Sequence, residues 1–225
     1  MSPIELIVPT RNRREKLVRM LNSVPAEANG APVEVVIVCD GDRETERFLL
    51  SLGNPAFRVV LVAEHRGAVY CRNLATSVSR GAVLYATDDI EFEKGAIDRA
   101  ARELAERFPD EDGVIGFAQS GNGKYSHAGV ALVGRAFVAR YPGRRLFYPG
   151  YYHFACQEIL RAAETVGRFY FCEAARLVHF HPSFNAGHKD RTHVEARVRR
   201  GRDKALSFER EAQGLIWGIG KEAAR

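Results

Sequence analysis

The chain has 225 residues, of which 46% are hydrophobic, and it carries a formal net charge of +5. These values are typical of one soluble globular domain. The longest apolar runs are far shorter than the roughly 20 residues that a membrane-spanning helix needs, and the opening residues lack the pattern of a secretion signal. We therefore expect a cytoplasmic protein without a transmembrane segment.

The cysteines and the basic residues further limit the class of protein that this sequence can encode. Cys39, Cys71, Cys156 and Cys172 lack CxxC spacing, so we expect reduced thiols rather than a disulfide framework or a zinc site. From position 189 onward the chain has ten basic and six acidic residues. The C-terminal segment is therefore the basic end of the chain.

The first 90 residues alternate between predicted strands and predicted helices. Runs rich in β-branched and aromatic residues predict strands buried on both faces at 4–10, 33–39, 57–63 and 82–87. Apolar residues at helical spacing predict helices at 13–24, 44–52 and 67–79. This order predicts an open, mostly parallel, doubly wound α/β sheet.

The second half continues with a predicted helix at 93–108, strands at 113–118 and 129–138, a helix at 155–165 and a strand at 168–182 that ends at Pro182. An arginine-rich amphipathic helix follows, with Val194, Val198, Ala205 and Leu206 on its apolar face. An apolar patch at 214–220 comes after it. No repeat or linker interrupts the chain, so we expect a single domain with a small second lobe.

Polar residues follow each of the four predicted parallel strands. In a sheet of this kind, ligands bind beyond the carboxyl ends of the strands. The strands end at "PTRNR", "CDGD", "EHRG" and "TDDIE". The pattern predicts a binding crevice, although ordinary loop residues and helix caps are the alternative for any one strand.

The acidic pair Asp88 and Asp89 suggests how a phosphate-bearing ligand is bound. The chain has neither GxGxxG after its first strand nor GxxxxGK[ST], the two glycine-rich phosphate motifs. Carboxylates are hard oxygen ligands for Mg²⁺ or Mn²⁺, and such an ion bridges substrate phosphates. Adjacent residues on an extended segment point to opposite faces, so each acid has its own role. A helix N-cap or a solvated turn explains the pair equally well.

Three motifs in order carry a resemblance to a known family. "IVPTRNRREKLVRMLNSV", "VVIVCDGD" and "GAVYCRNLATSVSRGAVLYATDDIEF" together resemble the nucleotide-sugar-binding half of family 2 glycosyltransferases with the GT-A fold. The resemblance continues more loosely through "YYHFACQEILRAAETVGRFYFCEAARLVHFHP". It implies a Rossmann-like, mostly parallel central sheet with flanking helices. Residues 1–118 would form the nucleotide-sugar-binding half, 119–188 the acceptor and catalytic half, and 189–225 a basic helical extension.

The resemblance also implies a donor site at the strand ends. Its members would be Pro9, Thr10, Arg11, Asp40, Arg72 and Asp88. Thr10 and Asp40 would contact the nucleotide base and ribose, and Arg72 would face the diphosphate. Asp88 would contact the ribose or the coordination shell of the metal ion.

Asp89 would be the main ligand of a divalent cation, and the resemblance offers His181 of "HFHP" as a second ligand. His179 and His181 are two residues apart on a predicted strand and therefore share one face. Imidazole is a more usual ligand for Mn²⁺ than for Mg²⁺, so manganese is favoured over magnesium. A structural histidine is the alternative, and Glu91 ranks below both aspartates as a ligand.

The catalytic base implied by the resemblance is Glu158. In many relatives the helix that carries the base opens with an acidic pair, but here Cys156 occupies the first acidic position and Glu158 lies two residues later. The alternatives are that Glu158 only orients the site, or that it is an exposed acid near a helix N-terminus. Tyr148, Tyr151, Tyr152 and His153 are candidates for stacking on an acceptor ring, with core packing as the alternative.

The predicted reaction moves a sugar from a nucleoside diphosphate sugar, with UDP-sugar as the expected donor, to an acceptor hydroxyl with inversion. The expected acceptor is a glycan or a lipid-linked sugar precursor. The basic C-terminal segment keeps two alternatives open: a glycosyltransferase acting on hydroxylated bases in DNA, and a non-catalytic nucleic-acid-binding protein. A sugar-phosphate nucleotidyltransferase is disfavoured, because the glycine- and arginine-rich opening loop is missing after the first strand.

Overall fold

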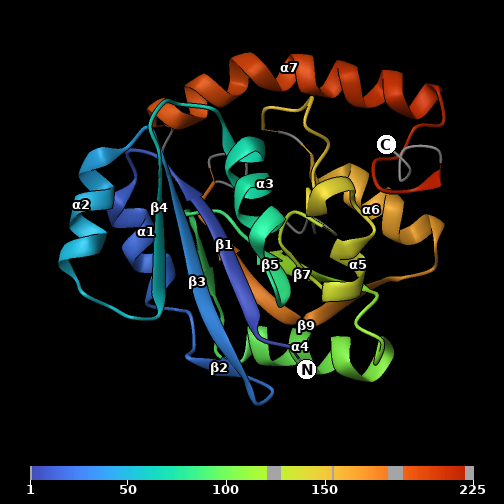
Figure 1. The fold of residues 1–225 in the computed structure, drawn as a ribbon, viewed down its shortest axis with the longest axis horizontal. Helices are drawn as coiled ribbons and strands as arrows, with labels where there is room; N and C mark the ends of the chain where they lie inside the picture. Colours follow the sequence, from blue (N-terminus) through green and yellow to red (C-terminus); the bar gives the residue numbers. More distant parts are fainter. Residues whose placement is uncertain (1, 121–127, 154, 182–189, 221–225) are drawn as a thin grey trace.

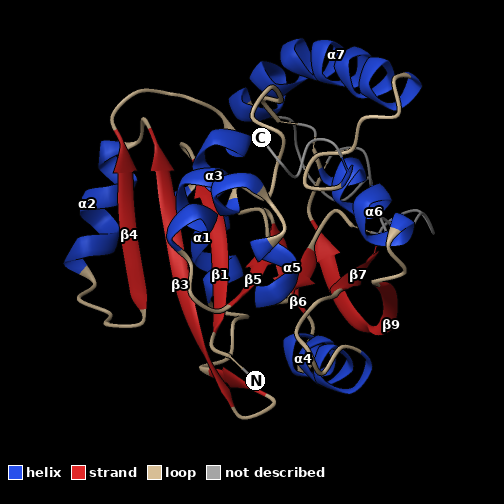
Figure 2. Cartoon of the chain, turned by 45° about the vertical axis from the view of Figure 1, so that its right-hand side comes forward, coloured by secondary structure: helices blue, strands red, loops and turns tan. Residues whose placement is uncertain are grey.

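One mixed sheet forms the centre of the molecule. The computed structural model describes residues 2–120, 128–153, 155–181 and 190–220. Within these residues the strands, in spatial order, are β2 (Glu27–Ala28), β3 (Ala31–Asp40), β1 (Ile4–Thr10), β5 (Ala82–Tyr85), β8 (Ala131–Val133), β7 (Val114–Ser120), β9 (Phe169–His179) and β6 (Ile90–Phe92). The strand β4 (Phe57–Val62) also pairs with β3. Figures 1 and 2 show the helices arranged around this sheet. The predicted α/β class, a central sheet with flanking helices, is confirmed.

The first half of the sheet is parallel. It contains β4 (Phe57–Val62), β3 (Ala31–Asp40), β1 (Ile4–Thr10) and β5 (Ala82–Tyr85). β1 pairs with β3 along its whole length, from Ile4 opposite Val33 to Thr10 opposite Cys39. Most residues of β1 and β5 are buried, as the continuous apolar runs predicted. All four carboxyl ends therefore reach the same edge of the sheet.

Helices cover both faces of the sheet. One hydrophobic cluster joins the sheet to α1 (Arg14–Leu21), α2 (Arg43–Ser51) and α4 (Ala96–Arg107). A second cluster joins the opposite face to α3 (Ala68–Val78), α5 (Arg135–Ala139) and α6 (Cys156–Thr165). Within β1, Leu6 and Val8 belong to the first cluster and Ile7 to the second, because successive side chains alternate between faces. The predicted doubly wound arrangement is confirmed.

The second half of the sheet mixes directions. β8 (Ala131–Val133) is antiparallel to both β5 and β7 (Val114–Ser120). β9 (Phe169–His179) is parallel to β7, with an irregularity between Phe117 and Ala118. The short β6 (Ile90–Phe92), which directly follows the two aspartates, is antiparallel to β9. The sheet thus brings the end of β9 beside Asp89.

The predicted strand at 129–138 is only partly correct. β8 ends at Val133, and after Gly134 the chain forms α5. Phe137 and Val138 of α5 are fully buried against the second cluster, so tertiary packing decides the conformation of this apolar run. The short elements β2 (Glu27–Ala28), β6 and the 3-10 turn η1 (Pro142–Arg144) were not predicted.

Helix α7 (Arg191–Ala212) runs along one side of the molecule, beyond the carboxyl ends of the parallel strands (Figure 1). Its start at Asp190 is a capping box, in which Asp190 accepts from the amide of His193. The helix itself was predicted. Of the residues predicted for its apolar face, Val194 and Val198 are 58% and 77% exposed, whereas Leu206 packs against the second cluster. The inner face of α7 also carries polar residues, described below.

None of the helices in the described ranges combines the length and apolar content that crossing a bilayer requires. The predicted division at 118 and 188 stays a prediction. β7 and β8 continue the same sheet across the first of these boundaries.

Candidate functional site

Polar side chains from β1 and from the segment after β5 meet at the carboxyl edge of the sheet. The hydroxyl of Thr10, the last residue of β1, donates to Asp88 Oδ2 at 2.9 Å. Thr10, Asp88 and Asp89 are all buried. Thr87 donates from its hydroxyl to Asp89 Oδ1 at 2.8 Å, which fixes the second carboxylate. The pairing of β1 with β5 creates this cluster from residues that are far apart in sequence.

Arg13 holds both aspartates, and sequence reasoning did not single it out. Its Nη1 lies 3.0 Å from Asp88 Oδ1 and 3.4 Å from Asp89 Oδ2. Its Nε and Nη2 each donate to Asp190 at 2.9 Å, and Lys16 Nζ donates to the same carboxylate at 2.6 Å. The available signal was its position in "PTRNR", directly before α1. Arg13 therefore ties the strand ends to the start of α7.

The two adjacent carboxylates differ in acidity. Burial is the main cause that raises the pKa of Asp88 to about 6, with the neighbouring Asp89 charge adding to it and Arg13 opposing it. Burial also acts to raise the pKa of Asp89, but hydrogen bonds from His179 and His193 outweigh it and hold that pKa well below its usual range. As pH falls, Asp88 therefore takes up a proton well before Asp89, which keeps its negative charge over a wider pH range.

Three histidines surround Asp89. His179 Nε2 lies 3.3 Å from Asp89 Oδ1, and His193 Nε2 lies 3.4 Å from Asp89 Oδ2. The ring of His181 is 5.4 Å from that of His179 and 4.7 Å from that of His193. Burial and the two neighbouring imidazoles lower the pKa of His181 to about 4, so it is neutral at pH 7. Sequence reasoning named His179 and His181 but missed His193, which the docking of α7 brings from a distant part of the chain.

The chemistry of this cluster fits a divalent cation, since one ionised carboxylate and neutral imidazole are both ligands for Mn²⁺. Across the part of the chain that the structure describes, no group of three or more His, Cys, Asp or Glu side chains stands in a metal-binding arrangement. Instead the Nε2 atoms of His179 and His193 lie 3.3 and 3.4 Å from the carboxylate of Asp89 itself.

Asp40, at the end of β3, organises the loop before α3. Its carboxylate accepts from the amides of Arg66 and Gly67 at 2.7 and 2.9 Å, and it lies 2.6 Å from His65 Nδ1. The other ring nitrogen of His65 is 2.6 Å from the hydroxyl of Tyr152. Asp40 thus lies at the predicted strand end, with contacts that position the start of α3.

Pro9 and Arg11 flank Thr10 at the same edge. Pro9 lies in β1 opposite Val38, and Arg11 Nη1 donates to the carbonyl of Asp40 at 3.4 Å. Arg11 Nε is 3.5 Å from Glu195 of α7. These contacts place α7 directly over the first strand end.

Arg72 is a buried cation beneath the same edge. It lies on α3, and its Nη2 donates to the carbonyl of Ala86 at 2.8 Å. Its guanidinium carbon is 5.8 Å from the ring centre of Tyr85 and 5.5 Å from that of Phe147. Its Nε has no hydrogen-bond partner among the described residues. A buried cation with an unused donor is a suitable neighbour for an anionic ligand group.

Glu158 lies in a buried ion pair between α6 and α7. Arg210 Nη2 donates to Glu158 Oε1 at 2.7 Å, and both side chains are about 4% exposed. The amide of Trp217 donates to the same oxygen at 2.9 Å. The structure does not link Glu158 to the Asp88–Asp89 cluster by any hydrogen bond given for the described residues. Cys156, at the start of α6, has its thiol 3.9 Å from the carbonyl of Gly129.

Of the aromatic residues predicted to stack on an acceptor ring, some pack in the protein interior and one lies at the candidate site. Tyr148 packs edge-on against Tyr151 and Trp217, with ring centres 5.4 and 5.6 Å apart, and Tyr151 is buried. Core packing therefore describes these two. Tyr152 is half-buried and contacts His65 at the strand edge.

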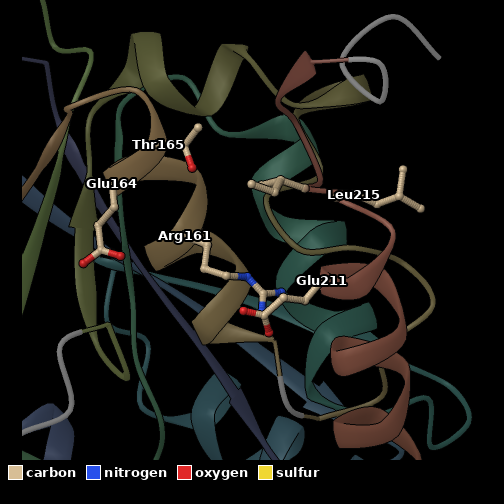
Figure 3. Close-up of a pocket in the computed structure, with 7 residues that line it drawn as sticks. Arg161, Glu164, Thr165, Glu211 and Leu215 are labelled. Atoms are coloured by element: carbon tan, nitrogen blue, oxygen red, sulfur yellow. The ribbon is translucent and has the colours of Figure 1, made fainter.

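A small pocket lies between α6 and the residues around the end of α7. Figure 3 shows Arg161 of α6 and Glu211 of α7 pointing toward one another, and their side chains form a 2.6 Å ion pair. The pocket has a volume of about 260 Å³ and is also lined by Glu164, Thr165 and Leu215. None of the predicted donor-site residues lines it.

Comparisons with solved structures show a glycosyltransferase fold. The chain is similar to the mannosyltransferase PcManGT from Pyrobaculum calidifontis, solved with GDP-Man and Mn²⁺, with a TM-score of 0.69 and 17% identity over 97% of this chain and 65% of that one. It is similar to S. aureus TarS 1-349, with a TM-score of 0.62 and 17% identity over 79% of this chain and 60% of that one.

The same TarS fragment in complex with UDP gives a TM-score of 0.61 and 18% identity, over 78% of this chain and 60% of that chain. The similarity therefore covers 60 to 65% of the length of these structures. Among curated proteins none matches the chain.

A family model is more specific than these structural similarities. The model described as glycosyl transferase family 2 matches residues 5–163, which include the carboxyl ends of β1, β3, β4 and β5. This match spans well over half of the sequence. The chain belongs to glycosyl transferase family 2.

Proposed function

We propose that this chain transfers a sugar from a nucleoside diphosphate sugar to an acceptor hydroxyl at the carboxyl edge of β1, β3 and β5. The observation that supports the proposal most directly is the buried cluster of Thr10, Arg13, Asp88 and Asp89 at that edge. Family membership supports the reaction class. The neighbouring structures hold GDP-Man or UDP, so guanine and uracil donors are the first to assay, with UDP-sugar as the donor predicted from the sequence.

Asp89 and His181 would hold a divalent cation, Mn²⁺ or Mg²⁺, and the Mn²⁺ in the mannosyltransferase complex supports this choice. Such an ion stabilises the negative charge that develops on a leaving diphosphate. Arg72, with its unused Nε donor, would add a fixed positive charge beside the diphosphate. Asp40 would position the nucleotide through the α3 loop that it organises.

Glu158 has two proposed roles. As the base, it would remove the proton from the acceptor hydroxyl on the face opposite the leaving group, which inverts the configuration. As a positioning residue, it would hold α6 against α7 through Arg210. The buried ion pair supports the positioning role, because a base needs access to the acceptor hydroxyl. Inversion and the acceptor, a glycan or a lipid-linked sugar, remain predictions.

Sugar transfer from UDP- and GDP-sugars, measured with and without Mn²⁺, tests the proposal. Asp89→Ala should abolish metal-dependent transfer while the far-UV circular dichroism and the folded state are retained. Glu91→Ala serves as the matched control, since it removes an acid two residues away and should retain activity. Full activity of the Asp89→Ala protein would refute the assignment.

The Glu158→Gln variant distinguishes the two proposed roles of Glu158. The base role predicts normal donor binding with most turnover lost, whereas the positioning role predicts turnover reduced only as far as stability is reduced. Nucleotide binding, turnover and urea unfolding of this one variant distinguish the two.

A further inference from the structure

The outer face of α7 is apolar where a surface helix is usually polar. Val194, Val198 and Phe208 are 58%, 77% and 58% exposed, whereas Asp203, Ser207 and Arg210 of the same helix are buried. Leu206 packs inward against the second cluster. Isolated exposed apolar residues are common on protein surfaces, but large apolar residues outside on a helix that buries an acid, a hydroxyl and a guanidinium are not.

The exposed apolar residues form one stripe. Val194, Val198, Gly201, Ala205 and Phe208 follow one another at steps of three or four residues and therefore lie on one side of the helix. All five are exposed. We call this set the outer stripe.

Basic residues border the outer stripe on both sides. At 100° per residue, Arg191 and Arg202 lie on one border, and Arg197 and Lys204 lie on the other. The first border also carries the exposed acid Glu209, and Arg191 pairs with Glu195 at 2.9 Å, so the second border is the more basic one. All four basic residues are exposed, and Lys204 lies over the ring of Phe208, with its Nζ 5.4 Å from the ring centre. Long basic side chains beside an apolar strip can place their stems along it while their charges reach outward.

A groove widens this basic border toward α6. It has a volume of about 550 Å³ and is lined by Gln157, Arg197, Arg200, Gly201, Lys204 and Phe208. Three of its lining side chains are cationic, and one is an exposed aromatic ring. Groups of this kind suit a phosphate headgroup attached to an apolar chain.

The polar inner face of α7 fastens the helix to the protein. Asp203 accepts from the amides of Tyr152 and His153, with distances of 3.1 and 2.7 Å to its carboxylate oxygens. Asp190 pairs with Arg13, and Arg210 pairs with Glu158. Because these contacts hold the inner face, the outer stripe is presented to solvent as a fixed surface.

We propose that α7 binds the surface of an anionic phospholipid bilayer, with the outer stripe inserted among the headgroups and the bordering arginines and lysine on lipid phosphates. An apolar stripe bordered by cations is the arrangement of helices that lie in a membrane interface. The basic residues that border the outer stripe are complementary in charge to the headgroups of an anionic leaflet. No helix in the described ranges could span a bilayer, so the contact is with its surface.

This placement goes beyond the proposed sugar transfer and does not depend on it. The start of α7 lies on the carboxyl edge of the sheet, through Thr192 to the carbonyl of Arg11 and His193 to Asp89. Bilayer binding along α7 therefore holds that edge close to the membrane surface.

Duplex DNA is the other polyanion that a basic helix could bind. DNA is held through phosphate contacts, which the apolar centre of the stripe does not supply. The bilayer is favoured because it uses the stripe and its borders together. Binding to a bilayer should therefore depend on Val198 and Phe208, whereas binding to DNA should not.

Sedimentation with phosphatidylcholine vesicles, with and without phosphatidylglycerol, tests the proposal on the full chain. We expect at least about tenfold tighter binding to the anionic vesicles. Val198→Asn with Phe208→Ser, and separately Arg197→Glu with Lys204→Glu, should each weaken that binding about tenfold. All four residues are exposed, so circular dichroism should show an unchanged fold.

Matched controls alter exposed residues outside α7. Leu50→Ser with Val78→Asn changes two residues that are 60% and 63% exposed, and Arg43→Glu with Arg47→Glu makes the same charge change on α2. Both should leave vesicle binding within about twofold of the original chain.

Equal binding to both kinds of vesicle would overturn the proposal. So would α7 variants that bind vesicles as the original chain does. Vesicle binding that is insensitive to the Val198 and Phe208 changes, together with duplex DNA binding of equal strength, would assign α7 to nucleic acid instead.

Discussion

Asp88 and Asp89 are neighbours whose pKa values are shifted in opposite directions, and the surroundings of each explain the difference. Asp88 is desolvated and hydrogen-bonded by Thr10, while Asp89 is held by two imidazoles and Arg13. Two adjacent carboxyl groups whose surroundings separate their pKa values are a common feature of functional sites. The sequence located both acids. Arg13 follows the same strand end as Thr10, but nothing in its sequence position shows that it reaches both acids. His193 could not be located in the cluster, because its contact depends on where α7 docks.

Asp42 provides a pH test at the residue scale. Burial acts to raise the pKa of Asp42, but hydrogen bonds from Thr45 and from the amide of Asn12 outweigh it, so its pKa lies below the usual range. The unfolded chain therefore takes up this proton first as pH falls. The stability from this carboxylate is complete above about pH 4 and is lost as pH drops through the lower folded pKa.

Asp42→Asn keeps a capping side chain at the start of α2 but removes the charge. At pH 7 it should lower the free energy of unfolding by about 1 kcal/mol, and this difference should shrink as pH falls below about 4. Urea unfolding at several pH values measures both. Glu44→Gln, an exposed acid in the same helix, should change little at any pH. A difference for Asp42→Asn that grows as pH falls would contradict the sign of the shift.

The Glu158–Arg210 pair predicts a large effect on stability. Arg210→Met leaves Glu158 buried without its partner and should lower the free energy of unfolding by about 3–5 kcal/mol. Adding Glu158→Gln should restore much of that loss, because the unpaired charge is then removed. Urea unfolding of the single and double variants measures both changes.

Arg161→Met is the control, because it breaks the exposed pair with Glu211 between the same two helices and should cost at most about 1 kcal/mol. An Arg210→Met protein as stable as this control would contradict the interpretation of the buried pair.

At the scale of elements, the sequence predicted helices and parallel strands well and predicted α5 and the faces of α7 poorly. The parallel strands are continuous apolar runs between helical patterns, which is a local signal. The apolar run before and within α5 suits a strand or a buried helix, and only packing against the second cluster decides between them. The spacing of Val194 and Val198 defines a face but not which side of α7 meets the protein. Asp203 and Arg210 decide that through partners elsewhere in the chain.

Substitution by alanine should change the free energy of unfolding in opposite directions at two glycines, one just before a strand and one inside a helix. A Cβ at Gly81, before β5, would lie 1.9 Å from the carbonyl oxygen of Pro3, so Gly81→Ala should lower the free energy of unfolding by about 1–3 kcal/mol. Gly201, inside α7, has nothing within 4 Å of such a Cβ, so Gly201→Ala should raise it by about 0.5–1 kcal/mol. Urea unfolding measures both, and a destabilising Gly201→Ala would contradict the exposed position of this side of α7.

At the scale of the whole molecule, one edge of the sheet collects residues from nearly the full length of the chain. Thr10, Asp40 and Asp89 follow parallel strands, so the sequence could predict that they meet. His179 reaches Asp89 through the antiparallel pair β6–β9, and a three-residue strand such as β6 carries no periodic signal. The predicted donor-site residues thus surround a cluster whose additional members come from tertiary packing.

The central claim is that this edge binds a nucleoside diphosphate together with a divalent cation. The most direct measurement is the shift in melting temperature caused by UDP, GDP and their sugars with and without Mn²⁺, because a ligand that binds the folded state stabilises it. We predict a rise for at least one nucleoside diphosphate with Mn²⁺, and its loss in Asp89→Asn but not in Glu91→Gln. The absence of any rise with every nucleotide, or a rise that Asp89→Asn retains in full, would contradict the account.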